Sequence, residues 1–172
     1  MKSMILYKSK YGATKQYADW LAESLELPAE DADEVSKDKI KNYDVVFIGT
    51  SVYFGKFLNE RWLRRKTKEL STKKKIFLFI VCASAADTNE CNEIIRSNVP
   101  IEIKDKCAFY FLPGKLLHHQ LSLFDRFILR VAGLFLRDPL KKQAMHNDLD
   151  EVKRENLNPL IIASKGFLIK AA

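Results

Sequence analysis

The sequence predicts an α/β fold, a doubly wound parallel sheet of about five strands in the order 2-1-3-4-5 with helices on both faces. Segments 44–49, 75–82 and 107–112 are apolar at nearly every position, which is typical of strands buried on both faces of a parallel sheet. Helical stretches separate these strands, and such alternation forms right-handed βαβ units. The chain has 172 residues, 47% of them apolar and 30% charged. This composition suits one globular domain over 1–172.

The first two elements come from short-range spacing. Residues 4–8 form a short apolar run and are expected to be the first strand. Residues 14–27 are expected to be a helix because Tyr17, Leu21 and Leu25 recur every four positions.

The other expected elements follow from composition and capping signals. Asn158-Pro159 is a capping residue followed by proline, a good helix start. The elements are a weak strand at 27–33, a basic helix at 57–70, a short helix at 88–97 and a closing helix at 159–169.

Positive charge is concentrated in two zones. The net charge is +7 and the pI is about 9.2. Residues 56–75 carry nine basic side chains against two acids, and residues 114–146 carry six against two. The pattern indicates an anionic partner, such as a membrane surface, nucleic acid or an acidic ligand. A solvated helix face is the plainer interpretation of the first zone, which lacks the interleaved aromatics of a nucleic-acid binder. We therefore expect no nucleic-acid partner.

Cysteine use and hydropathy indicate a cytoplasmic protein. No run reaches the roughly 18 apolar residues of a transmembrane helix, and the N-terminus does not read as a signal peptide. Cys82, Cys91 and Cys107 form no C-x-x-C motif, which argues against a disulfide framework or a thiolate metal site. Cys82 and Cys91 are expected to be small buried hydrophobes. We assign no metal ligand.

The loop after the first strand is the first candidate site, because ligands of such sheets bind at the carboxyl ends of the strands. The backbone N–H groups and hydroxyls of this loop could surround a terminal phosphate, and the N-terminus of the following helix would add partial positive charge. A ligand-free helix-capping loop is the alternative. The candidate residues are Ser9, Lys10, Tyr11, Gly12, Ala13 and Thr14.

The pattern Ser9-x-x-Gly12-x-Thr14 after an apolar strand resembles the FMN phosphate loop of flavodoxins, [ST]-x-T-G-x-T. Tyr11 departs from the usual threonine, and Lys10 adds a charge that could pair with the phosphate. The resemblance implies a flavodoxin-like fold with FMN as its cofactor.

Two further loops are implied to hold the flavin ring. The exit of the third strand would supply backbone groups, hydroxyls and an aromatic side chain, although core packing is an equal alternative for its aromatics. The fourth-strand exit has no aromatic residue to cover the ring, so one face would stay open to a planar substrate or quinone. The candidate residues are Thr50, Ser51, Val52, Tyr53, Phe54, Gly55, Ala83, Ser84, Ala85 and Asp87.

Residues 116–136 alternate apolar and basic positions in a helical pattern. Leu121 and Phe124 would share an apolar face, and Arg126 would lie on the basic edge, an arrangement that could lie in a membrane interface or pack on the sheet. The run Phe124-Asp125-Arg126-Phe127 and the loop IGTSVYFGKF resemble menaquinone-dependent protoporphyrinogen IX dehydrogenases, which carry such a segment after the last strand. By this resemblance, 114–146 is an insert.

The leading hypothesis is therefore an FMN oxidoreductase that passes electrons from a reduced tetrapyrrole to a quinone. It would lie free in the cytoplasm or peripherally on the inner face of the cell membrane, with 114–137 against anionic lipid. The alternatives are a soluble flavodoxin-type electron carrier, a quinone reductase and a cofactor-free binding protein of the same fold. A net charge of +7 argues against the carrier, since carriers of that family are typically acidic. No catalytic residue and no oligomeric state are assigned.

Overall fold

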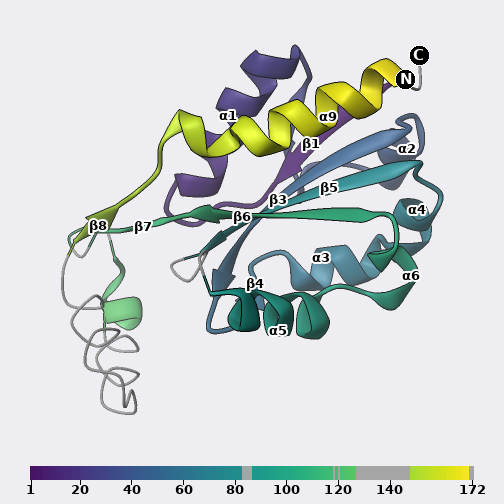
Figure 1. Cartoon of the computed structure of the whole chain (residues 1–172). Coiled ribbons are helices and arrows are strands. Elements are labelled where there is room, and N and C mark those ends of the chain that lie inside the picture. The colour runs from purple at the N-terminus through teal and green to yellow at the C-terminus, as the bar shows by residue number, and fades with distance from the viewer. Residues whose placement is uncertain (83–86, 118, 120, 127–147, 171–172) are drawn as a thin grey trace.

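A parallel sheet forms the centre of the protein (Figure 1). The computed structural model describes residues 1–82, 87–117, 119, 121–126 and 148–170. Five parallel strands pair in the order β2-β1-β3-β5-β6, which confirms the predicted fold class and strand order. The strands are β1 (Ser3–Tyr7), β2 (Ala29–Asp31), β3 (Val45–Tyr53), β5 (Lys75–Cys82) and β6 (Cys107–Pro113).

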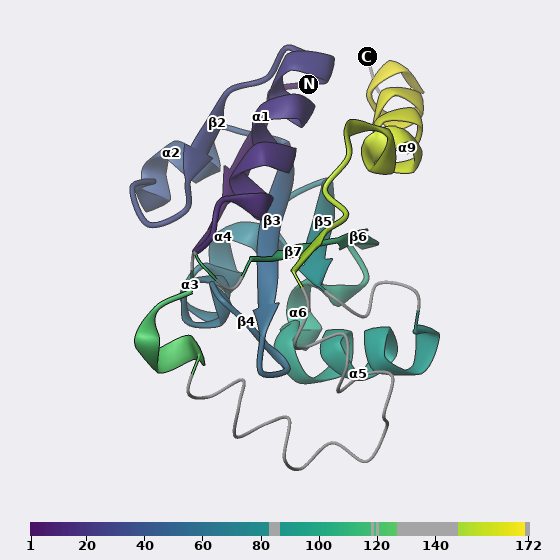
Figure 2. The ribbon, with the colours of Figure 1, turned by 90° about the vertical axis from the view of Figure 1, so that its left-hand side faces the viewer.

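Helices cover both faces of this sheet (Figures 1 and 2). One face packs against α1, α9 and the 3-10 helix η2, and the other packs against α2 to α6. None of the helices among the described residues is long and apolar enough to cross a membrane. The helices are α1 (Ala13–Leu25), α2 (Lys37–Lys41), α3 (Glu60–Arg65), α4 (Thr67–Ser71), α5 (Thr88–Asn98), α6 (Ile101–Lys104), the 3-10 helix η2 (Arg154–Leu157) and α9 (Asn158–Lys170).

The core strands are buried on both faces, as their unbroken apolar runs predict. In β3, Val46 and Ile48 join the cluster under α3 to α6, whereas Val45 and Phe47 join the cluster under α1 and α9. Gly49 is required by close packing, since a Cβ there would lie 2.3 Å from the ring of Phe79. Cys82 and Cys91 are buried as expected.

The prediction of one helix over 57–70 was wrong, and so was the predicted end of the third strand at Gly49. β3 continues to Tyr53, turns, and pairs with the short antiparallel strand β4 (Lys56–Phe57). The amide of Leu58 donates to the carbonyl of Ser51, so this segment belongs to the sheet edge and the helix starts only at Glu60. The helical spacing of Leu58 and Trp62 concealed this because β4, with two residues, is too short to show an alternating pattern of its own.

A two-stranded ribbon follows the sheet and closes the base of the insert. β7 (Lys115–Leu116) pairs antiparallel with β8 (Leu149–Asp150), and the Glu151 amide donates to the carbonyl of Gly114. The insert therefore leaves and rejoins the fold at one place, beside the carboxyl end of β6 (Figure 1).

Candidate functional site

The loop between β1 and α1 has the geometry of an anion cradle. The Gly12 amide donates to Ser9 Oγ over 3.1 Å, and Gly12 adopts φ 84°, a left-handed conformation that suits glycine. No side chain caps the start of α1, and its first turn has no acidic residue. The amides of this turn and the helix dipole together favour a negatively charged group at this position.

Lys115 supplies a positive charge beside this cradle. Its Nζ lies 3.8 Å from the point where a Cβ on Gly12 would stand. Lys115 reaches the loop because the β7–β8 ribbon leaves β6 at the same edge of the sheet. Among the described residues, its side chain makes no ion pair or hydrogen bond. It is therefore available to an anion bound at Gly12.

The side chains of Lys10 and Tyr11 turn away from the cradle and bind Asp125. The Lys10 ammonium lies 2.7 Å from one carboxylate oxygen of Asp125, and the Tyr11 hydroxyl donates to the same carboxylate. Burial lowers the pKa of Lys10, but its bonds to Asp125 and Tyr53 outweigh this effect and leave the pKa above its ordinary value. Lys10 stays protonated there at neutral pH.

Tyr53 joins the same carboxylate from the other side. Its hydroxyl donates to Asp125, and the Lys10 ammonium lies 4.3 Å from the centroid of the Tyr53 ring, within the range of a cation–π contact. Asp125 itself is only 2% exposed. Three side chains, two from the β1–α1 loop and one from the end of β3, thus donate to the buried carboxylate of Asp125.

The turn after Tyr53 carries an exposed aromatic ring in a strained conformation. Phe54 has φ 51°, its neighbour Gly55 has φ 73°, and the Phe54 side chain is 51% exposed. A left-handed phenylalanine costs roughly 1–2 kcal/mol, and the half-exposed ring recovers only part of this through burial. Backbone strain of this kind clusters at functional sites. The Phe54 ring meets the Tyr53 ring edge-on, with 4.6 Å between their centroids.

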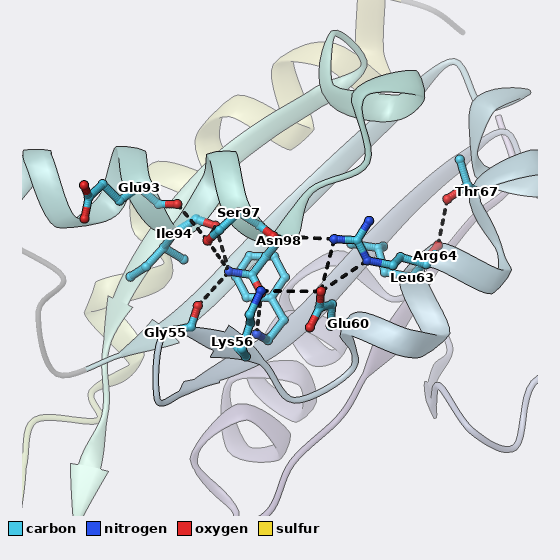
Figure 3. A network of polar contacts seen from close by, with 11 residues as sticks. Gly55, Lys56, Glu60, Leu63, Arg64, Thr67, Glu93, Ile94, Ser97 and Asn98 are labelled. Carbon is cyan, nitrogen blue, oxygen red and sulfur yellow. Dashed lines mark hydrogen bonds and ion pairs between the residues drawn. The ribbon is translucent and has the colours of Figure 1, made fainter. Parts of the chain in front are cut away.

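A buried asparagine on α5 holds this hairpin in place (Figure 3). Asn98 Oδ1 accepts the amide of Phe57 over 2.9 Å. Its Nδ2 donates to the carbonyls of Gly55 over 2.8 Å and of Ile94 over 2.9 Å. Asn98 is fully buried, so its hydrogen bonds to Gly55 and Phe57 fix the turn that follows Tyr53.

The remaining predicted residues are spread along three elements. Thr50 is fully buried in β3 and its hydroxyl bonds the carbonyl of Ser51, so its side chain points into the protein. Ser51 and Val52 are half-buried farther along β3. Asp87 caps α5 by accepting two backbone amides. In the cradle, Ala13 and Thr14 are buried in the first turn of α1. Ala83, Ser84 and Ala85 lie outside the described residues.

The beginning of the insert is placed differently from the prediction. Leu121 is buried, whereas Leu123 is 82% and Phe124 68% exposed. A helical turn starts only at Leu123, because Ser122 caps it by accepting the amide of Asp125. The prediction that Leu121 and Phe124 share one helix face was therefore wrong. Residues 127–136 of the predicted helical segment lie outside the described residues.

Asp125 and Asn98 were not predicted as site residues, and Lys115 was predicted only as part of the basic zone 114–146. The spacing Ser122-x-x-Asp125 is a helix-start signal that could have marked the end of the insert loop. The sequence around Asn98 contains no motif that marks it as a site residue.

A family model described as a flavodoxin domain, Flavodoxin_5, matches residues 4–134. An uncharacterized protein of Methanocaldococcus jannaschii is 38% identical over 80 residues, which are 46% of this chain and 53% of that protein. The alignment thus spans about half the length of this curated relative.

Comparison with solved structures gives flavodoxins, and one of them reaches a TM-score above 0.5. A WrbA-like flavodoxin from Agrobacterium tumefaciens aligns with a TM-score of 0.52 and 17% identity, over 72% of this chain and 87% of that one. A flavodoxin from the domain Archaea aligns with a TM-score of 0.48 and 16% identity, over 77% and 96%. At these identities the likeness concerns the fold alone.

Proposed function

The chain belongs to the flavodoxin domain family, and from that premise we propose that it is an FMN-dependent oxidoreductase which passes electrons from a reduced tetrapyrrole, such as protoporphyrinogen IX, to a quinone. Proteins of this fold family normally bind FMN and transfer electrons. When bound, FMN supplies the redox chemistry. The protein's part is to hold the cofactor, to place the substrate and to restrict water.

The residues of the cradle suit the phosphate of FMN. The uncapped first turn of α1 offers its amides, Ser9 shapes the loop through its bond to the Gly12 amide, and Lys115 adds a charge next to Gly12. A phosphate is dianionic, so an added ammonium strengthens its binding through a charge-assisted hydrogen bond. The hairpin with Tyr53 and Phe54 would flank the ring.

The observation that carries the enzyme assignment is a set of exposed apolar side chains on two segments that a hydrogen bond joins. Phe54 follows Tyr53 and is 51% exposed, whereas Leu123 and Phe124 precede Asp125 and are 82% and 68% exposed; the Tyr53 hydroxyl donates to Asp125. Arg126, next to Asp125, adds an exposed positive charge. A planar apolar molecule with carboxylate groups fits these side chains, because aromatic side chains stack on its plane and arginine pairs with its carboxylates.

The first test is the visible spectrum of the purified protein after desalting, with and without added FMN, followed by assays of protoporphyrinogen oxidation and naphthoquinone reduction. We expect bound flavin and turnover with both substrates. Bound flavin without either turnover would favour an electron carrier. A colourless protein that does not quench FMN fluorescence would favour the cofactor-free binding protein.

A variant of Lys115 tests the cradle separately. Lys115→Met should weaken FMN binding by about tenfold, since a hydrogen bond to a charged group contributes about 1.5 kcal/mol. Lys68→Met is the matched control, because Lys68 is an exposed lysine on α4. Equal FMN affinities of the two variants would exclude Lys115 as a phosphate ligand.

Peripheral membrane binding through 114–137 remains a proposal of its own. Sedimentation with anionic vesicles, compared with neutral vesicles, tests it; no difference between them would reject it.

A further inference from the structure

We propose that Asp125 is a positioning residue. It would hold the start of the insert against the β1–α1 loop and the end of β3, and so determine where a substrate binds relative to the Tyr53–Phe54 hairpin. This inference rests on the proposed function for its substrate, but the anchoring itself is a property of the protein without cofactor.

The geometry of the carboxylate supports an anchor. Both of its oxygens are engaged: Oδ1 by Tyr53 and Lys10, and Oδ2 by Tyr11 and Lys10. A carboxylate that is 2% exposed is costly to bury unless it is paired and hydrogen-bonded. Here it is paired completely, so moving the insert away would break all of these contacts together.

The backbone of the insert uses the same attachment. The Ser122 amide lies 3.4 Å from the Tyr11 hydroxyl, so one phenol bridges this amide and the Asp125 carboxylate. Ser122 in turn caps the turn that holds Asp125, through its Oγ and its carbonyl. The Tyr11 hydroxyl therefore binds the start of the insert at two points. This gives a physical reason for a tyrosine where flavodoxins usually have threonine.

The Asp125 contacts also link the segments that carry two exposed aromatic rings, those of Phe54 and Phe124. Tyr53 is followed directly by Phe54, and Asp125 is preceded directly by Phe124. The hydrogen bond between Tyr53 and Asp125 thus joins the two segments that carry these rings, of which Phe54 is 51% and Phe124 68% exposed. A planar substrate that contacts both rings would bind only while this bond holds them in register.

Hydrogen–deuterium exchange of the FMN-free protein tests the anchor. In Asp125→Ala, the peptide containing residues 121–126 should exchange at least tenfold faster than in the parent, whereas a β5 peptide should be unchanged. Asp38→Ala is the control, since Asp38 is exposed and pairs only with Lys41 among the described residues. Equal protection of 121–126 in Asp125→Ala and Asp38→Ala would overturn the proposal, whether or not the protein binds FMN.

Conservative variants separate anchoring from general stability. Tyr53→Phe keeps the ring but loses the hydroxyl, so it should also speed the exchange of 121–126, by at least threefold. In the FMN-loaded protein, Asp125→Ala should raise the KM for a soluble naphthoquinone at least fivefold and change kcat less than twofold. An unchanged KM, or a loss confined to kcat, would reject the positioning role. Absence of FMN binding in the parent would reject the proposed function while leaving the exchange result to decide the anchor.

Discussion

Replacing Asn98 with alanine removes the buried side chain that holds the Tyr53–Phe54 hairpin from below. Three effects follow. The amide of Phe57 loses its acceptor and, because Phe57 is 3% exposed, water cannot replace it. The carbonyl of Gly55 loses its donor, but Gly55 is exposed and its carbonyl can turn to water. The small cavity left under the hairpin removes packing contacts.

The size of the loss in the free energy of unfolding follows from these effects. An unsatisfied buried amide costs about 1–3 kcal/mol, and each exchanged hydrogen bond contributes about 0.5–1.5 kcal/mol net. We therefore expect Asn98→Ala to lower the free energy of unfolding by about 3 kcal/mol, most of it from the Phe57 amide.

Urea unfolding followed by circular dichroism measures this change. Asn92→Ala is the control, because Asn92 is an exposed asparagine on the same helix; it should change stability by no more than about 0.5 kcal/mol. A loss in Asn98→Ala below about 1 kcal/mol would refute the reasoning, since it would mean that the Phe57 amide finds another partner.

Three further predictions concern other parts of the protein. Gly12→Asp, which forces a side chain into φ 84° and sets a carboxylate in the cradle, should abolish FMN retention after desalting, whereas Gly166→Asp should not, because that glycine faces open space; equal flavin content would contradict the cradle. Phe54→Asn should weaken quinone binding and change the unfolding free energy by less than about 1 kcal/mol, because asparagine relieves a left-handed strain of about 1–2 kcal/mol but loses the edge-on contact with Tyr53, worth about 0.5–1.5 kcal/mol; a loss above about 2 kcal/mol would contradict this balance. Burial lowers the pKa of Lys73 below its ordinary value of 10.5, so the unfolded chain binds more protons between the two pKa values and the unfolding free energy rises with pH across that window; Lys73→Met should remove this rise in urea titrations at alkaline pH, and an unchanged slope would be inconsistent with it.

Local patterns were sufficient for the fold. The apolar runs of β3, β5 and β6 can be buried on both faces only in a covered parallel sheet, and the spacing of α1 and the Asn158-Pro159 start of α9 are short-range signals. The element boundaries there agree within a few residues. The bond between the Gly12 amide and Ser9 Oγ also lies within one loop, so a local pattern was enough to single out this loop as a candidate.

Tertiary structure decided the roles of the side chains around that loop. Lys10 and Tyr11 were expected at the phosphate, yet they bind a carboxylate 115 and 114 positions away. Lys115 reaches Gly12 through a ribbon that forms only when residues 115–116 meet 149–150, and Asn98 reaches the hairpin across 41 positions. Such pairings leave no periodicity in either segment, because each partner is locally an ordinary polar residue. What the sequence determined by itself was therefore the parallel sheet and the burial of its central strands, whereas the hairpin after β3 and the charge partners of the site follow from which segments the packed sheet brings into contact.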